Sequence, residues 1–578
     1  MKILLAAINA KYIHSNLAIY SLRAYANRYA GEIRIKEYTI NQPLDGILMD
    51  LYEEKPDVIC FSCYLWNIIC VEQLLAEIPK VLPDTRLWLG GPEVSWNAVE
   101  ILKRYPAVEG VMCGEGEETF LELTDYFHGC GRELSDIRGI AYRLPGQLPS
   151  VTGSRPAIDL SGIPFVYGNT ENFKNRIIYY ESSRGCPFSC SYCLSSVDRC
   201  LRFRDLELVK KELQFFIDHE VPQVKFVDRT FNCRHDHAMA VWSYIVEHDR
   251  GKTNFHFEIA ADLLNEEEIR LIKSMRPGLI QLEIGVQSTN ERTIREIRRT
   301  MKTERVRKVT AAVRENRNVH QHLDLIAGLP WEDYESFAAS FNDVYGMRPE
   351  QLQLGFLKVL KGSLMHEKAE EYGLLYQDRP PYEVLSTRWL SYGDVIRLKK
   401  VEEMVEVYYN SAQFVNTMRE LESEFPSPFA MYEALAGYYG ENGLFDISHS
   451  RIARYEILYH FICGLGVKNP EEYREWLTLD MYLRDNVRNR PEFLGENTVT
   501  KDEAAQFYRM EAREHCWLRD YEGYDSRQMR KMTHLERIRG KLLLFDYRKR
   551  DPLTGDAAVC EVVSGMKGRG RMTENEFL

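Results

Sequence analysis

The chain has 578 residues, of which 45% are hydrophobic and 28% charged, and its formal net charge at pH 7 is −12. These values are ordinary for a soluble protein of several domains, and the acidic balance disfavours coating of nucleic acids or anionic membranes. The sequence has 13 cysteines but no secretory signal, and its longest apolar stretch, residues 58–71, is interrupted by Ser62 and Asn67. We therefore expect a cytoplasmic protein with free thiols and metal ligands, without disulfides and without a membrane span.

Residues 1–130 alternate between strand-like and helix-like patterns. Short apolar strands are expected at residues 2–7, 33–40, 58–63, 86–89 and 110–113. This alternation predicts an α/β domain with a Rossmann-like open parallel sheet and helices on both faces, which binds ligands at the carboxyl ends of its strands. Two loops at those ends suit a large flat cofactor, and they contain Gly90, Gly91, Pro92 and Glu93, and Gly114, Glu115 and Gly116.

A connector is expected at residues 131–175. Residues 139–143 read as one strand of a small hairpin, and residues 145–169 are rich in Pro, Gly and Ser. Such a composition is typical of an extended crossing between domains.

The most informative stretch follows an apolar strand at residues 177–180. Cys186, Cys190 and Cys193 are spaced C-x3-C-x2-C after an Arg-Gly pair, with Phe188 and Tyr192 between the thiols. Three thiolates on one loop can hold three irons of a cubane cluster and leave the fourth iron open. A zinc site would need a fourth ligand from elsewhere, and three structural cysteines are the plainer alternative. The lead residues and the aromatic side chains favour the cluster.

Residues 176–375 repeat the strand–helix alternation with longer helices. Strands are expected at residues 177–182, 223–227, 255–259, 279–286, 322–327 and 352–359, and a helix is expected across residues 291–315. Six such units predict a partial (β/α)6 barrel of the TIM type, with its site at the carboxyl ends of the strands. Polar or flexible residues that fall near those ends are Asp228, Glu258, Glu283, Gln287 and Gly328. The alternatives are a helix cap for Asp228, a buried ion pair for Glu258, and ordinary strand residues for the others.

The motifs resemble those of radical S-adenosylmethionine (SAM) enzymes that carry an N-terminal cobalamin-binding domain, the class B methylase-like group. The resemblance lies in E-x-S-R-G-C-P-F-x-C-x-Y-C at residues 181–193, and in G-G-P-E followed by V-x-C-G-E-G-E-x-x-F in the first domain. It implies a [4Fe-4S] cluster on Cys186, Cys190 and Cys193, with SAM on the open iron and cleaved to a 5′-deoxyadenosyl radical. It also implies cobalamin at the two glycine loops. No D-x-H-x-x-G motif occurs, so the resemblance implies no histidine below cobalt.

The resemblance extends to the strand ends of the barrel. F-x-D-x-x-F contains Asp228, E-x-G-x-Q-S contains Glu283 and Gln287, and D-x-I-x-G-x-P contains Gly328. These residues, with Phe188, Tyr192 and Glu258, are the expected cofactor contacts.

Residues 376–578 read as a mostly helical, aromatic-rich domain of unknown role with no catalytic motif. A basic run spans residues 527–550, with Lys567, Arg569 and Arg571 near the end. We expect a solvated helix face there, and nucleic acid is the less favoured partner.

The leading hypothesis is a cobalamin-dependent radical SAM enzyme that methylates an unactivated carbon of an unknown substrate. It would take electrons from a donor such as flavodoxin or ferredoxin. The alternatives are cobalamin-dependent rearrangement or cyclisation, methylthio transfer to tRNA, and a non-catalytic cobalamin or redox sensor. Methylthio transfer is disfavoured because no cysteine precedes Cys60.

Overall fold

The computed structural model describes residues 1–168, 173–197, 199–487 and 489–563. The chain divides into two compact units, and each is described by itself. Residues 1–319, 326–333 and 355–392 form the first unit, and residues 320–325, 334–354 and 393–578 form the second. None of the helices in the described ranges has the length and apolar character needed to cross a bilayer.

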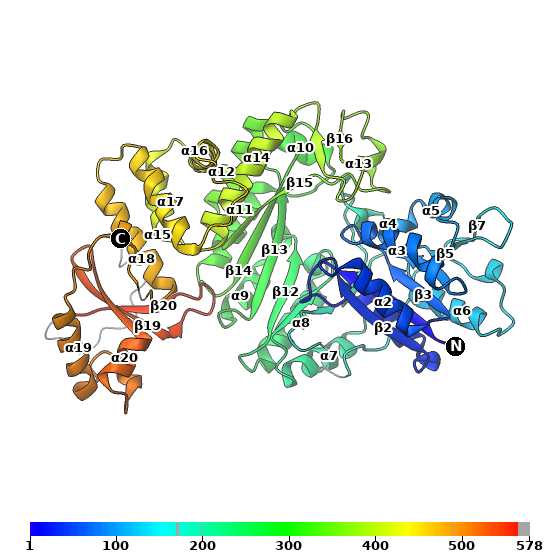
Figure 1. Ribbon diagram of the computed structural model, residues 1–578, viewed down its shortest axis with the longest axis horizontal. Coiled ribbons are helices and arrows are strands. Elements are labelled where there is room, and N and C mark those ends of the chain that lie inside the picture. Colours follow the sequence, from blue (N-terminus) through cyan, green and yellow to red (C-terminus); the bar gives the residue numbers. More distant parts are fainter. Residues whose placement is uncertain (169–172, 198, 488, 564–578) are drawn as a thin grey trace. The chain divides into compact units, whose positions relative to one another are not determined.

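The first unit begins with a seven-stranded sheet in the order β2-β1-β3-β4-β5-β6-β7. Its five parallel strands are β1 (Ile3–Asn9), β2 (Ile33–Thr39), β3 (Val58–Ser62), β4 (Arg86–Gly90) and β5 (Val108–Met112). In Figure 1 helices cover both faces of this sheet. They are α1 (Leu17–Tyr25), α2 (Leu44–Glu54), α3 (Ile68–Val81), α4 (Pro92–Ser95), α5 (Ala98–Arg104) and α6 (Glu117–Phe127).

Alternation along β1 explains why both faces are covered. Leu4, Ala6 and Ile8 pack into one apolar core, and the residues between them pack into a second core on the opposite face. All seven residues of β1 are buried, as expected for a strand in the interior of a parallel sheet. The predicted Rossmann-like fold is confirmed. The expected connector strand is present as β6 (Ile140–Tyr142), which pairs antiparallel to β5 and is followed by β7 (Ser150–Val151).

The second large sheet has six strands in the order β15-β14-β13-β12-β11-β8. They are β8 (Ile178–Tyr180), β11 (Gln223–Phe226), β12 (Asn254–Ile259), β13 (Ile280–Gln287), β14 (His320–Ala327) and β15 (Gln351–Phe356). The strands β8, β11, β12 and β13 pair in parallel. Six strands are present where the partial barrel was predicted. The helices that connect them include α7 (Leu206–Asp218), α8 (His235–His248) and α9 (Glu266–Ser274).

The long helix predicted at residues 291–315 is broken in two. Helix α10 (Glu291–Glu296) ends at Ile297, and α11 (Thr303–Arg314) begins after Lys302. Between them Arg298 has a positive φ of 55°. The carbonyl of Ile297 accepts a hydrogen bond from the Ser191 amide at 2.9 Å instead of continuing the helix. This tertiary contact overrides a pattern that reads as one amphipathic helix.

The first unit closes with α13 (Leu364–Glu367) and a short pair, β16 (Leu375–Tyr376) and β17 (Val384–Ser386). The second unit is largely helical. Its helices are α12 (Tyr334–Gly346), α14 (Tyr392–Val405), α15 (Val415–Leu421), α16 (Pro428–Glu441), α17 (Arg451–Gly464), α18 (Pro470–Arg484), α19 (Lys501–Glu514) and α20 (Ser526–Met532).

The helical character of the C-terminal part is confirmed, but it also contains an antiparallel sheet that was not predicted. Its strands are β18 (Thr533–Ile538), β19 (Lys541–Arg550) and β20 (Ala557–Glu561). Arg539 and Gly540, both with positive φ, connect the first two strands, as in a tight hairpin turn.

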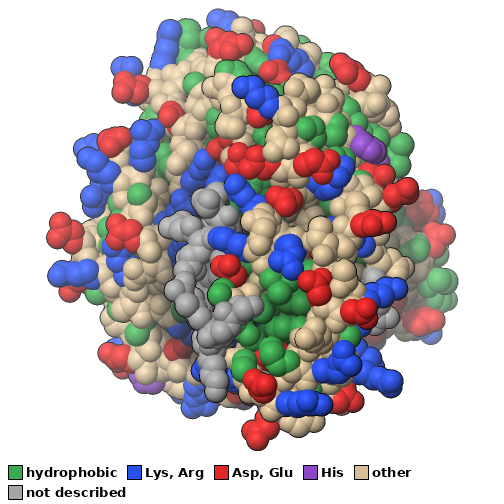
Figure 2. Space-filling model, turned by 90° about the vertical axis from the view of Figure 1, so that its left-hand side faces the viewer, with side chains coloured by type: hydrophobic (Ala, Val, Ile, Leu, Met, Phe, Trp, Pro, Cys, Tyr) green, Lys and Arg blue, Asp and Glu red, His purple; other side chains and the backbone are tan. Residues whose placement is uncertain are grey.

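The basic run therefore lies partly on strands, and several of its charges are paired. Arg537 lies 3.6 Å from Glu503, Arg539 lies 3.3 Å from Glu472, and Lys549 pairs with Asp520. Figure 2 shows basic and acidic side chains interspersed over one face of the molecule. Lys567, Arg569 and Arg571 lie outside the described residues.

Candidate functional site

A cavity of about 1250 Å³ lies in the first unit, where the carboxyl ends of the first sheet face the cysteine loop. Six of the seven predicted glycine-loop residues line it: Gly90, Gly91, Pro92, Gly114, Glu115 and Gly116. The other side is lined by residues beside the cysteines and at strand ends of the barrel: Tyr179, Glu181, Ser183, Arg184, Gly185, Leu194, Ser195, Val227 and Arg229. Two domains predicted separately from the sequence thus share one cavity.

The glycines of this cavity have distinct physical roles. Gly91 has a φ of 113°, and a Cβ there would overlap the backbone carbonyl of Cys63, so only glycine fits the turn after β4. Gly114 has a φ of 82°, and a Cβ there would meet no atom within 4 Å. Its backbone therefore faces open space and can be approached closely by a ligand.

Glu93, the seventh residue of the predicted loops, does not line the cavity. Its carboxylate accepts a hydrogen bond from the Tyr382 hydroxyl and lies 3.9 Å from the Lys361 ammonium group. Burial raises the pKa of Glu93, and these two partners oppose that rise. The side chain therefore binds the segment after the barrel.

Two aromatic side chains of the cavity were not predicted. Tyr64 and Trp66 follow β3, and their rings stack with centroids 4.5 Å apart and an angle of 7° between planes. The Trp66 indole N–H donates to the Ile8 carbonyl at 3.1 Å, which fixes the ring. The stack gives the cavity a flat apolar wall at the same sheet edge as the glycine loops. The usable signal was their position directly after a buried strand of this sheet.

Arg184 joins the two sides of the cavity. Its guanidinium donates to Glu181 at 2.9 and 2.7 Å, to Glu115 at 3.1 Å and to Glu117 at 2.7 Å. Glu115 is also paired with Arg202 at 2.9 Å and accepts from the Ile158 amide at 2.9 Å. Burial raises the pKa of Glu115, but its contacts with Arg202, the Ile158 amide and Arg184 outweigh burial and lower the pKa overall. The Arg-Gly lead of the cysteine motif thus ties the cysteine strand to the second glycine loop.

The cysteine loop leaves the short strand β9 (Ser183–Arg184) through Gly185. Gly185 has a φ of 94°, and a Cβ there would lie 2.6 Å from the Cys200 carbonyl oxygen. Cys186 and Cys190 are buried and Cys193 is half-buried. Among the described residues the three sulfurs do not form a group within 4.8 Å of one another. Three thiolates on one zinc ion would be about 3.8 Å apart, given Zn–S bonds of about 2.3 Å. Three cysteines on one loop are the ligand set that holds three irons of a cubane cluster and leaves the fourth open.

Asp228 lies beneath this loop and does not line the cavity. Its carboxylate accepts from the Ser182 amide at 3.0 Å and from the Ser182 and Ser183 hydroxyls at 2.6 Å each. The side chain is fully buried, and burial raises its pKa to about 6 despite these three donors. His237 adds a contact to the Ser182 hydroxyl at 3.0 Å. Asp228 thus fixes the chain that leads into the cysteines.

The E-x-G-x-Q-S segment forms the end of β13. Gln287 has a φ of 73°, and its amide folds back over Gly285, where a Cβ would overlap it. The Gln287 side-chain carbonyl oxygen is buried and accepts no hydrogen bond from the described residues. A buried acceptor without a donor favours a ligand with a hydroxyl or N–H group at this point.

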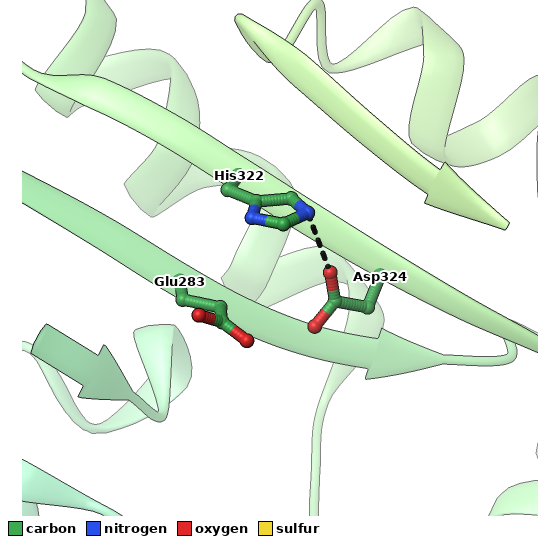
Figure 3. A group of neighbouring side chains, drawn as sticks. All are labelled: Glu283, His322 and Asp324. Carbon is green, nitrogen blue, oxygen red and sulfur yellow. Dashed lines mark ion pairs between the residues drawn. The ribbon is translucent and has the colours of Figure 1, made fainter. Parts of the chain in front are cut away.

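Glu283 and the β14 residues form ion pairs inside their own units. Glu283 accepts from Lys225 at 3.1 Å and from His256 at 2.9 Å, and these partners lower its pKa to about 2 against the effect of burial. In the second unit His322 pairs with Asp324 at 3.1 Å, the interaction marked in Figure 3. Figure 3 also draws Glu283 on its strand.

The remaining predicted contacts are dispersed. Phe188 and Tyr192 are half-buried within the cysteine loop, and Glu258 stands opposite Glu283 in the register of β12 and β13. Gly328 has a φ of 89°, and a Cβ there would lie 2.7 Å from Val384. The predicted SAM contacts therefore lie on the cysteine loop and at the barrel strands, and they do not line the cavity.

One residue of this region was missed entirely. Arg299, in the break between α10 and α11, donates to the Tyr192 hydroxyl at 3.1 Å and to the Cys190 sulfur at 3.8 Å. No sequence signal marked it, because the segment read as a continuous helix.

Three family descriptions match successive parts of the chain. The B12 binding domain matches residues 3–124, the radical SAM superfamily matches residues 180–344, and a protein family of unknown function, DUF4080, matches residues 370–552.

Curated relatives include a cobalamin-dependent radical SAM methyltransferase, TokK, of Streptomyces tokunonensis. It is 23% identical over 59% of this chain and 53% of the relative. An anaerobic magnesium-protoporphyrin IX monomethyl ester cyclase of Rubrivivax gelatinosus is 24% identical over 57% of this chain and 62% of the relative. The chain thus spans just over half the length of these two relatives.

Solved structures show the same fold. The cobalamin-dependent SAM radical enzyme OxsB, solved with aqua-cobalamin and SAM bound, covers 83% of this chain with a TM-score of 0.56 at 14% identity, over 79% of the OxsB chain. The radical SAM methyltransferase TsrM from Kitasatospora setae, solved with cobalamin and a [4Fe-4S] cluster bound, covers 66% of this chain with a TM-score of 0.53 at 17% identity, over 82% of the TsrM chain.

Proposed function

Because this chain joins a B12-binding domain to a domain of the radical SAM superfamily, we propose that it is a cobalamin-dependent radical SAM methyltransferase. Its substrate would be a compound with an unactivated carbon. The observation that carries the proposal is the shared cavity, which the glycine loops line on one side and residues beside the cysteines on the other. A methyl carrier and a radical source must act on the same substrate, so their sites must open into one space.

In this proposal Cys186, Cys190 and Cys193 hold a [4Fe-4S] cluster, and SAM occupies the space above them. When bound, the cluster and cobalamin supply one-electron and methyl-carrying chemistry that amino-acid side chains lack. The chain itself would position these groups and exclude water from them. Asp228 fixes Ser182 and Ser183 ahead of the loop, so the thiols keep one geometry.

Phe188, Tyr192, Glu258, Gln287 and Gly328 are the proposed SAM contacts. Gln287 is the best supported of them, because its buried carbonyl oxygen accepts nothing from the described residues and can accept from a ribose hydroxyl. The Glu283 carboxylate already accepts from Lys225 and His256, so its proposed role is to hold a polar barrel interior.

Cobalamin is proposed to lie against the glycine loops, with Gly114 allowing close approach of the backbone. The stacked Tyr64 and Trp66 rings provide a flat apolar surface for the corrin. His14 also lines the cavity, but its Nδ1 lies 2.6 Å from the Tyr179 hydroxyl. Burial lowers the pKa of His14, which favours a neutral ring hydrogen-bonded to Tyr179.

Cyclisation is the second candidate, supported by the relative named as a cyclase. Both candidates need a low-potential one-electron donor such as flavodoxin or ferredoxin, and we propose that both act in the cytoplasm. The role of the C-terminal domain, residues 376–578, is proposed to be selection of the substrate.

The test is an anaerobic turnover assay with reconstituted protein, reductant and SAM. A methyltransferase is expected to release both 5′-deoxyadenosine and S-adenosylhomocysteine, and release of the second product requires cobalamin. Release of 5′-deoxyadenosine without S-adenosylhomocysteine would leave cyclisation, or a methyltransferase that lacks its substrate. Absence of both products from protein that retains cluster and cobalamin would reject both candidates and favour a sensor.

A further inference from the structure

Arg299 occupies the helix break beside the cysteine loop. One guanidinium nitrogen donates to the Cys190 sulfur at 3.8 Å and to the Tyr192 hydroxyl at 3.1 Å, and the other donates to the Gly285 carbonyl. The bond to Gly285 holds the guanidinium on β13, and the bond to Cys190 directs its charge at a cysteine of the motif. The break is therefore used to place a cation against one thiol.

This cation has no acidic partner among the described residues. Among the described residues the guanidinium contacts a thiol, a phenol and a carbonyl, and the Arg299 Nε is buried without a hydrogen-bond partner there. Arg184, by contrast, is surrounded by three carboxylates. Because no carboxylate neutralises Arg299, its charge acts on whatever Cys190 binds.

We propose that Arg299 is a positioning residue that raises the reduction potential of the cluster held by Cys190. The inference rests on the proposed function, since it assumes that the cysteines hold the cluster. Reduction adds one electron from a low-potential donor to the cluster and changes its net charge by −1. A nearby cation, and an N–H donated to a thiolate sulfur, stabilise the more negative state.

A second donor lies beside the same cysteine. The Ser191 hydroxyl is buried and has no hydrogen-bond partner among the described residues. The Ser191 amide and carbonyl are both engaged, with Ile297 and Met365, so the residue is held in place. Its free hydroxyl can donate to a sulfur of a bound cluster, and its contribution should add to that of Arg299.

The test is an anaerobic redox titration of the reconstituted protein without SAM, followed by electron paramagnetic resonance of the reduced cluster. In Arg299→Met the reduced-to-oxidised ratio at a fixed potential is expected to fall at least tenfold, a 59 mV change for one electron. Arg299→Lys keeps the charge and should shift the ratio less. Arg298→Met is the matched control, because Arg298 is adjacent and exposed, and it should leave the ratio unchanged.

The outcomes separate the inference from the function it rests on. If the wild-type protein forms no cluster, the proposed function fails. If the wild type forms a cluster and Arg299→Met titrates like the wild type, only the inference fails, even if SAM binding weakens. If Arg299→Met loses iron, Arg299→Gln and Arg299→Lys are compared, and equal potentials in the two would overturn the role of charge.

Discussion

Removal of the Arg184 side chain tests how the two sides of the cavity are held together. Arg184→Met leaves three carboxylates without this partner, and their side chains are 20%, 7% and 22% exposed for Glu115, Glu117 and Glu181. Loss of one partner from a buried pair costs about 3–5 kcal/mol. Because these groups keep some solvent, and Arg202 still pairs with Glu115, we expect about 2–3 kcal/mol of local stability to be lost.

Amide hydrogen exchange measures this loss where it occurs. A change of about 2–3 kcal/mol corresponds to about 30- to 150-fold faster exchange, since each 1.4 kcal/mol is a factor of ten. The acceleration should appear in peptides that cover residues 114–120 and 181–186 of the cofactor-free protein. Arg104→Met is the control, because Arg104 is 67% exposed and pairs with Glu72 at 3.4 Å. Its effect should stay below about fivefold. Equal exchange in the two variants would refute the role given to Arg184.

Three further outcomes are expected. Asp480 is a buried residue of α18, and burial raises its pKa to about 6. The folded state therefore binds more protons than the unfolded state between pH of about 4 and 6, and its stability falls as pH rises through this window. In urea denaturation, Asp480→Asn should flatten this dependence of stability on pH. Gly91→Ala should destabilise the cofactor-free protein by more than ~2 kcal/mol, because the added Cβ overlaps Cys63. Gly114→Ala should lower its stability by about 1 kcal/mol, and its main effect should be less cobalamin retained on gel filtration. Trp66→Ala should lower cobalamin retention at unchanged iron content, and equal retention would exclude the aromatic wall.

The sheets were predictable from sequence because most strands are either nearly continuous in apolar residues, as in β1 and β3, or alternate apolar and polar residues, as in β12 and β13. The seven buried residues of β1 leave no other reading than an interior strand of a parallel sheet. The sheet at residues 533–561 was missed because charged residues interrupt it. Glu536 and Asp546 are buried on these strands, so the apolar alternation that identifies a strand is broken.

The site was predictable where function depends on residue type at fixed spacing, as for the cysteines and the glycine loops. It was not predictable where function depends on a tertiary contact. Glu93 turns to Tyr382, which is far away in the sequence, and Arg299 reaches Cys190 only because the Ile297 carbonyl accepts from Ser191 and the helix breaks. Local pattern carries no information about either contact.

The most direct test of the central claim is cysteine-dependent cleavage of SAM. Wild-type protein and Cys190→Ala are loaded anaerobically with cobalamin to equal content, supplied with iron, sulfide, reductant and SAM, and assayed for 5′-deoxyadenosine by mass spectrometry. We predict that the wild type forms 5′-deoxyadenosine over time and that Cys190→Ala forms less than a hundredth as much while keeping its cobalamin. Equal formation by both proteins would contradict the assignment of the cysteine loop, and no formation by a wild type that holds a [4Fe-4S] cluster would contradict cleavage of SAM by this protein.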